Sequence, residues 1–250
     1  MNSTPEATRS PRHEFETNGY VLLRSWLPET DLTEVTSECR RLIATAKESE
    51  TDEAGIPGRV TVQGAVGRSR RLRDLLLCSR AAELFEGLFG HDYSLHFSQV
   101  MQRPCSEIDT TPWHRDGPMA SDRFLDLGNP PPLMTLRLGI FLSDCSAPSS
   151  GELEIVPGSH RSVLEPGDTA SGDSMMTRAG DAVVFHNAVL HRVRPNQGDS
   201  TLRLYFGVGY PWMRPWDYSV PEPHTISGLS AREARVLGGF PKLTSPYSLP

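Results

Sequence analysis

The sequence contains neither a long apolar run nor an excess of positive charge. No stretch approaches the ~20 apolar residues of a transmembrane helix, and the start MNSTPEATRSPRHEF lacks the apolar core of a secretory signal. The formal net charge is -6 and the pI is near 5.8, which argues against nucleic acid or an anionic membrane as the main partner. We expect a cytoplasmic protein, monomer or homodimer, that acts on a small molecule.

Cysteine is scarce and scattered. The four cysteines lie far apart without a Cys-x-x-Cys pair, so neither a zinc knuckle nor a disulfide framework is indicated. These residues are Cys39, Cys78, Cys105 and Cys145. We therefore expect four reduced thiols.

The chain has 250 residues with 37% hydrophobic content, enough for one full core. We expect a disordered polar tail over residues 1–12 and a single domain over 13–250. A strand is expected within 18–27, an amphipathic helix in "PETDLTEVTSECRRLIATA" (28–46), whose apolar residues recur every three or four positions, and a further helical stretch over 72–88. The charged, aperiodic segment 48–58 reads as a mobile loop.

From Tyr93 onward the pattern changes to short apolar runs separated by Gly, Pro and Asp. The runs are "YSLHFSQVMQ", "LMTLRLGIFL", "ELEIV", "DAVVFH" and "TLRLYFGVGY". This spacing is typical of a β-sandwich or barrel rather than of alternating strands and helices. The expected fold class is mainly β with flanking helices.

One polar motif stands out, His114-x-Asp116 in "PWHRDGP". With 8 His and 31 acidic residues in the chain, roughly one such spacing is expected by chance, so the motif needs a third ligand. His191 follows the run 182–186, 77 residues after His114, and a jelly roll can bring such distant positions together. Two imidazoles and one carboxylate leave adjacent coordination positions open, which suits non-haem Fe(II).

A second candidate is Arg203 in "TLRLYFG". On a strand it shares one face with Tyr205 and Gly207, and its neighbours are apolar. The planar guanidinium binds a carboxylate through two parallel hydrogen bonds. Arg203 is therefore a candidate for holding the distal end of a dicarboxylate cosubstrate.

Together these segments resemble the phytanoyl-CoA dioxygenase-like (PhyH) branch of the Fe(II)/2-oxoglutarate-dependent dioxygenases. The matching pieces, in the family's order over about residues 15–210, are "FETNGYVLLRSWL", "PWHRDGP", "SSGELEIVPGSHR", "GDAVVFHNAVLHRVRPN" and the strand with Arg203. The ordered set is more specific than any one piece. The resemblance implies a double-stranded β-helix, that is, a cupin-like jelly roll.

The resemblance also implies roles for individual residues. His114, Asp116 and His191 would be the metal ligands and catalytic centre, and Arg203 would bind the C5 carboxylate of 2-oxoglutarate. Two polar residues, Gln99 and Thr135, would also hold the cosubstrate. At position 193 the family often has a small hydroxyl residue that contacts the same carboxylate, whereas this chain has Val193. That contact is either lost or supplied by Thr135.

The implied reaction is hydroxylation of an unactivated C–H bond in a small molecule, a specialised metabolite or amino-acid-like compound. 2-Oxoglutarate and O2 would become succinate and CO2. Asp116 argues against halogenation, because halogenating relatives have a small residue there, while desaturation, epoxidation and cyclisation use the same ligands. The rival interpretations are a same-fold metalloenzyme without 2-oxoglutarate, such as an isomerase or hydrolase, and a non-catalytic cupin-like binding protein.

Several other residues have less specific patterns. His186 and His160 are expected to pack or hydrogen-bond rather than bind metal. The side chain of Trp113 could either line the substrate pocket or pack in the core. Arg137 could pair either with an anionic substrate or with a structural acid, and the structural acid is favoured. Pocket-closing segments are expected at 49–64, 117–134 and in the tail after Tyr210, where Trp212, Trp216 and Tyr218 either line the pocket or pack on the barrel.

Overall fold

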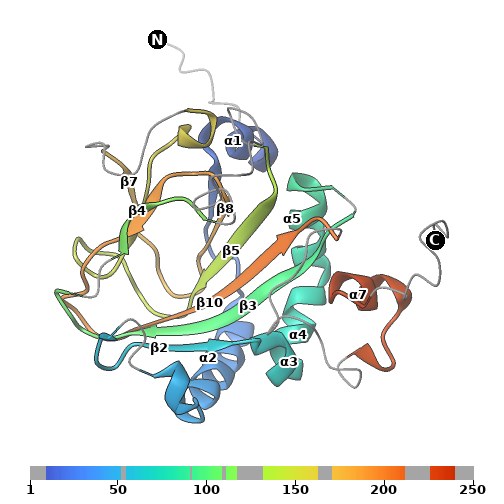
Figure 1. Ribbon diagram of the computed structural model, residues 1–250, viewed down its shortest axis with the longest axis horizontal. Helices are drawn as coiled ribbons and strands as arrows, with labels where there is room; N and C mark the ends of the chain where they lie inside the picture. Colours follow the sequence, from blue (N-terminus) through green and yellow to red (C-terminus); the bar gives the residue numbers. More distant parts are fainter. Residues whose placement is uncertain are drawn as a thin grey trace.

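The protein is described here from a computed structural model over residues 10–51, 55–90, 92–108, 111–116, 132–162, 171–211 and 226–239 (Figure 1). The strands are β1 (Tyr20–Leu23), β2 (Val60–Gln63), β3 (Ser94–Arg103), β4 (Thr111–His114), β5 (Thr135–Phe141), β6 (Leu153–Ile155), β7 (Asp173–Met175), β8 (Ala182–His186), β9 (His191–Val193) and β10 (Thr201–Gly209). The helices are α1 (Pro11–Asn18), α2 (Glu29–Ala44), α3 (Ala65–Arg68), α4 (Arg70–Leu77), α5 (Ser79–Leu88) and α7 (Ala231–Val236), with short 3-10 turns η1 (Glu48–Glu50) and η4 (Ser159–Arg161).

The strands form two antiparallel sheets. The large sheet has the order β1-β8-β5-β10-β3-β2, and the small sheet has the order β4-β9-β6-β7. The chain crosses repeatedly between the two sheets, so that sequential strands are rarely neighbours. This arrangement is a double-stranded β-helix, or jelly roll, and it confirms the fold class expected from the sequence.

Helices cover the outer face of the large sheet (Figure 1). Helix α2 buries Val35, Cys39 and Leu42, which lie on one side because they are three or four positions apart. They join the outward-facing residues of the strands, such as Leu204 and Val100, in one apolar cluster. Burial of these side chains holds the helices to the barrel.

The helical stretch expected over 72–88 is two helices. The side chain of Ser69 accepts a hydrogen bond from Leu72 N and caps α4. The chain then turns at Cys78, whose extended backbone (φ -66°, ψ 157°) ends α4 and precedes α5. A single periodic stretch can hide such a break because both helices contribute buried side chains to the same apolar cluster.

The N-terminal boundary differs from the expectation. Helix α1 begins at Pro11, capped by Ser10, and ends at Gly19 in the left-handed conformation (φ 82°). The tail expected to be disordered through residue 12 therefore includes two helical residues, and 1–9 lie outside the described part. The expected loop 48–58 contains η1, where Glu50 pairs with Arg68 at 2.6 Å.

The inner face of the large sheet carries every second residue of each strand. Cross-strand pairing places Arg203, Tyr205 and Gly207 opposite Phe141, Gly139 and Arg137 on that face. A Cβ on Gly207 would lie 1.9 Å from a ring carbon of Phe97, and one on Gly139 would lie 2.8 Å from Tyr205. Glycine at these two positions therefore leaves room for aromatic rings inside the barrel.

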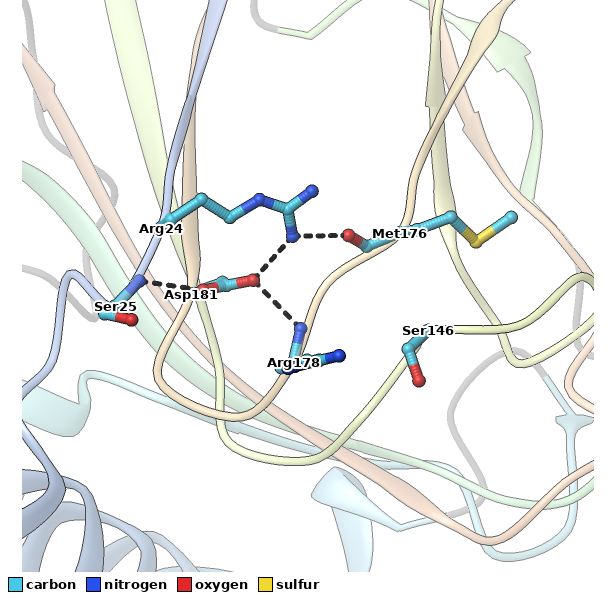
Figure 2. A pocket seen from close by; sticks show the side chains of 6 residues that line it. All are labelled: Arg24, Ser25, Ser146, Met176, Arg178 and Asp181. Atoms are coloured by element: carbon cyan, nitrogen blue, oxygen red, sulfur yellow. Dashed lines mark hydrogen bonds and ion pairs between the residues drawn. The ribbon is translucent and has the colours of Figure 1, made fainter.

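At the β5 end that carries Phe141, the turn before β8 forms an outer pocket (Figure 2). The carboxylate of Asp181 accepts hydrogen bonds from Ser25 N (2.8 Å), Arg178 N (3.0 Å) and the Arg24 guanidinium (2.8 Å). Burial alone would raise the pKa of Asp181, but these donors outweigh it and the pKa is lowered. The pocket has a volume of about 440 Å³.

The remaining sequence-level expectations concern membranes and thiols. Among the described helices, none is long and apolar enough to cross a membrane. All four cysteines are free thiols, as expected from their spacing, and the structure shows that Cys39 and Cys145 are buried.

Candidate metal centre

Strand pairing in the small sheet brings the two candidate histidines together. His114 is the last residue of β4, His191 is the first residue of β9, and the two are direct cross-strand partners. Asp116 lies two residues beyond β4, where its backbone N–H donates to Asn187 O at 2.8 Å. The three side chains converge although they come from segments far apart in the sequence.

The geometry of the three side chains is that of a metal triad. Asp116 Oδ1 lies 3.8 Å from His114 Nε2, and Asp116 Oδ2 lies 3.6 Å from His191 Nε2. The candidate ligand atoms all lie within 4.8 Å of one another. A single ion between them would meet two nitrogens and one oxygen, the donor set of non-haem iron sites.

Both histidines are fixed by a hydrogen bond on the ring nitrogen that faces away from Asp116. His114 Nδ1 lies 2.8 Å from Pro112 O, and His191 Nδ1 lies 3.0 Å from Val189 O. A carbonyl partner requires the proton on Nδ1 and leaves the Nε2 lone pair for a metal.

The protonation states also suit a metal. Burial lowers the pKa of His191 to about 4, with Asp116 opposing the shift. Burial by itself would raise the pKa of Asp116, but the charge of Arg137, followed by electrostatic interactions with His191 and His114, prevails and the pKa is lowered. At neutral pH His191 is neutral and Asp116 is ionised, which is the state that binds a metal.

Arg203 lies inside the barrel and is 1% exposed. Its guanidinium donates to Gly151 O, to Cys145 Sγ (3.6 Å) and to the Tyr205 hydroxyl (3.4 Å), and it lies over the Phe141 ring. Its Nε has no hydrogen bond, and no acidic side chain of the described residues pairs with it. A buried cation without a counter-charge is costly, so the residues present fit an anionic ligand at Arg203.

The two residues predicted to assist cosubstrate binding, Gln99 and Thr135, lie at different distances from Arg203 along the strands. Gln99 is buried opposite Tyr205, on the same inner face as Arg203. Thr135 lies opposite Gly209, six residues along β10 from Arg203, about 20 Å along the strand. Thr135 therefore cannot share a carboxylate with Arg203, and the suggestion that it replaces the contact missing at Val193 is wrong.

Arg137 lies at the candidate metal centre. From the sequence, a structural acid was favoured as its partner, without any link to the metal ligands. Its Nε lies 3.1 Å from Asp116 Oδ2, so the acid it meets is a candidate metal ligand. The register places it on the inner face between Thr135 and Gly139. The sequence showed the shared strand face but not which acid lies across the barrel.

Arg115, between the two ligands of the motif, was missed by sequence reasoning. Its guanidinium donates to Ser159 O (2.9 Å), Ser162 O (3.3 Å) and Ala188 O. It thus connects the loop that carries Asp116 to the turn after β6 and to the turn before β9. Its place inside His-x-Asp is the one sequence signal that could have indicated this role.

The other residues weighed from the sequence lie away from the triad. His186 Nδ1 accepts a hydrogen bond from Ala188 N (2.9 Å), and its ring packs on Phe15 and His160, consistent with the packing role expected for both histidines. Trp113 precedes His114 on β4, so the alternation of side chains directs it away from the triad, and the Arg192 guanidinium carbon lies 4.5 Å from the Trp113 ring centroid. The segment 117–131 and the residues Trp212, Trp216 and Tyr218 lie outside the described residues.

A jelly roll with a His-Asp-His triad between its sheets defines the class of cupin-like non-haem metal proteins. Residues 15–204 match the family model described as phytanoyl-CoA dioxygenase (PhyH). The chain belongs to this family. A sequence comparison with curated proteins gives no match.

Solved structures share the fold at low sequence identity. One is the epimerase SnoN in complex with Fe3+, α-ketoglutarate and nogalamycin RO, at 21% identity and a TM-score of 0.68, covering 91% of this chain and 93% of that chain. Another is HygX from Streptomyces hygroscopicus with nickel, 2-oxoglutarate and hygromycin B, at 18% identity and a TM-score of 0.68, covering 84% and 90%. A third is the carbocyclase SnoK from nogalamycin biosynthesis, at 21% identity and a TM-score of 0.61, covering 82% and 84%.

Proposed function

We propose that the protein is an Fe(II)/2-oxoglutarate-dependent oxygenase that hydroxylates an unactivated C–H bond of a small molecule. One O2 and one 2-oxoglutarate are consumed. One oxygen atom enters the product and the other enters succinate, with release of CO2. The observation that carries the proposal is a metal triad in the same barrel interior as a buried Arg203 that pairs with no acidic side chain of the described residues.

The chain's own residues have separate tasks in this scheme. His114, Asp116 and His191 hold the metal, which supplies the redox and O2 chemistry when bound. Arg203, with Gln99 beside it on the inner face, holds the C5 carboxylate of the cosubstrate. The surrounding apolar side chains exclude water, which strengthens each electrostatic contact inside the barrel.

Two rival classes are less well supported. A metalloenzyme without 2-oxoglutarate has no use for a buried guanidinium that meets no acid in the described part of the chain, whereas a dicarboxylate explains Arg203. A non-catalytic binding protein does not need the complete ligand set with both Nε2 atoms turned inward.

Hydroxylation, as the type of reaction, is the more specific part of the proposal. Asp116 occupies the position that halogenating relatives leave to a small residue. The proteins with similar folds include an epimerase, a carbocyclase and a monooxygenase, so the product decides the reaction type. Some of these proteins are associated with nogalamycin and hygromycin B, which supports a specialised metabolite as substrate.

The test is an anaerobic titration of the metal-free protein with Fe(II), with and without 2-oxoglutarate. We expect a weak visible charge-transfer band only when both are present, and succinate after O2 is admitted. Asp116→Ala is the negative control and should give no band. A wild-type protein that binds Fe(II) but gives neither band nor succinate would overturn the proposal. Mass spectrometry of products then distinguishes a gain of one oxygen from desaturation or cyclisation.

A further inference from the structure

Arg137 lies beside the metal triad in a pocket made of aromatic rings. Its guanidinium carbon lies 4.8 Å from the ring centroid of Phe97, 5.7 Å from that of Tyr205 and 5.9 Å from that of Phe185. Such contacts stabilise a cation but do not neutralise it. The side chain is 20% exposed, so most of its charge is removed from water.

The anionic partner of Arg137 is a residue that a metal also needs. Asp116 Oδ2 lies 3.1 Å from Arg137 Nε, yet both are buried atoms without a hydrogen bond. The two groups attract each other without the directed contact of a guanidinium–carboxylate pair. A metal at the triad would draw on the charge of the same carboxylate, and Arg137 would then need another anion.

The spacing of Arg137 and Arg203 fits a short dicarboxylate. Both flank one ring, since Arg203 Nη1 lies 3.4 Å from the Tyr205 hydroxyl and the Arg137 guanidinium lies 5.7 Å from the ring centroid. With standard bond lengths, these contacts place the two guanidinium carbons no more than about 13 Å apart. A five-carbon dicarboxylate spans about 5 Å between its carboxyl carbons, and a guanidinium carbon lies about 4 Å from the carboxyl carbon that it pairs with.

We propose that Arg137 binds the C1 carboxylate of 2-oxoglutarate, the end beside the metal, while Arg203 binds the C5 carboxylate. This inference rests on the proposed function and deepens it. Asp116 is the partner of Arg137 before loading, and the cosubstrate is its partner afterwards. The two arginines together match the two negative charges of the cosubstrate.

The test compares two ligands that differ only at the distal end. 2-Oxoglutarate has both carboxylates, whereas 2-oxopentanoate keeps the C1 carboxylate and the ketone but lacks the C5 carboxylate. Affinities are measured anaerobically at saturating Fe(II) from the charge-transfer band. We expect Arg137→Gln to weaken both ligands by about 10- to 100-fold, the range for a hydrogen bond to a charged group, and Arg203→Gln to weaken 2-oxoglutarate alone.

A second measurement distinguishes this role from mere positioning of Asp116. Fe(II) is titrated without cosubstrate into the wild type, Arg137→Gln and Arg137→Lys. If Arg137 only orients the metal ligand, Fe(II) affinity falls while 2-oxoglutarate affinity at saturating metal stays unchanged, and that result would overturn the inference. Arg137→Lys keeps the charge but not the fork and should retain part of the cosubstrate affinity.

The matched control is Arg178→Gln, in the outer pocket of Figure 2, which removes a guanidinium outside the barrel and should leave both affinities unchanged. Thermal unfolding of each metal-free variant shows whether it is folded. The 2-oxoglutarate arm decides the inference even if 2-oxopentanoate binds too weakly to measure. A wild type that gives no band refutes the proposed function, whereas equal affinities of wild type and Arg137→Gln refute only the role of Arg137.

Discussion

The two metal-binding histidines are oriented by the same local contact. Each places Nδ1 against the carbonyl of the residue two positions earlier, Pro112 for His114 and Val189 for His191. Because this partner comes from the histidine's own segment, the ring orientation needs no distant side chain. The contacts that orient the two rings are thus made to the main chain, which substitutions elsewhere disturb little.

Substitution of Asp116 tests whether this residue is a metal ligand. We expect Asp116→Ala to abolish turnover and to reduce Fe(II) or Ni²⁺ affinity by at least about 10- to 100-fold. The backbone contact of residue 116 with Asn187 O is kept, but Arg137 loses its anionic partner, so the unfolding free energy should fall by about 1–3 kcal/mol. Isothermal titration calorimetry and chemical denaturation measure the two effects.

The control for this variant is Asp144→Ala, which removes an exposed acid that accepts a hydrogen bond from Ala179 N. It should leave metal affinity unchanged. Wild-type turnover in Asp116→Ala would show that the triad is assigned wrongly.

Some single residues could be predicted from the sequence and others could not. His114, Asp116, His191 and Arg203 lie in ordered motifs, and the structure brings the three ligands together and places Arg203 in the same interior. The partner of Arg137 depends on which acid lies across the barrel, and a one-dimensional pattern does not contain that information. The same holds for Trp113, whose side of the small sheet follows from the register of β4 with β9.

Helix α1 is attached to the barrel through two buried histidines. Phe15 of α1 stacks on His186, and His160 Nε2 lies 3.3 Å from Glu16 O. Burial, followed by the nearby charges of His160 and Arg115, lowers the pKa of His186 to about 3. Burial also lowers the pKa of His160. The contact therefore requires neutral rings.

A pH dependence of stability follows from His186. Its folded pKa is about 3 and its unfolded pKa is about 6.5, so between these values the unfolded chain binds a proton that the folded chain does not. The unfolding free energy should fall as the pH falls, by at most about 1.4 kcal/mol per pH unit. Denaturation of the metal-free protein between pH 6.5 and 4.5 measures this slope, and His186→Phe should flatten it.

Because His186→Phe also removes the acceptor of Ala188 N, the slope is the readout rather than the stability at pH 7. His13→Gln, on the exposed side of α1, serves as the control and should keep the wild-type slope. Equal slopes in wild type and His186→Phe would contradict this account.

Secondary-structure elements were predictable where one face is buried continuously. The apolar spacing in 28–46 gave α2, and the short apolar runs gave most of the strands. Helix α1 was not predicted because only Phe15 is buried among its eight residues, so periodicity is absent. The sequence features that indicate α1 are local: Ser10 caps the helix and Pro11 is its first residue.

On the scale of the whole molecule, the site joins the two sheets. The small sheet supplies His114 and His191, and the large sheet supplies Arg203, Arg137 and Gln99. A metal with its cosubstrate would therefore make contacts that cross the interior. A ligand that binds only the native state increases the unfolding free energy by RT ln(1 + L/Kd), where L is the free ligand concentration and Kd its dissociation constant.

This arrangement predicts cooperative stabilisation. We expect Ni²⁺ and 2-oxoglutarate together to raise the melting temperature by more than the sum of their separate effects, because in the proposed function the cosubstrate binds the metal as well as Arg203. At about 100 times the dissociation constant the gain is about 2.7 kcal/mol. Differential scanning fluorimetry with each ligand alone and with both measures it.

Arg203→Gln provides the comparison for this experiment. It should keep the shift caused by Ni²⁺ and lose most of the additional shift, corresponding to about 2–4 kcal/mol of 2-oxoglutarate binding. An undiminished additional shift would mean that another group holds the distal carboxylate.

The cross-strand pair of His114 with His191 has a consequence for the order of events in folding. The pair closes a chain segment of 77 residues, and contacts of such long sequence separation form only after a large loss of chain entropy. The ligands cannot converge before β9 has docked against β4, so a metal cannot act as the nucleus of folding. A newly synthesised chain must pair β9 with β4 first, and acquisition of metal by all three residues then reports that this pairing has formed.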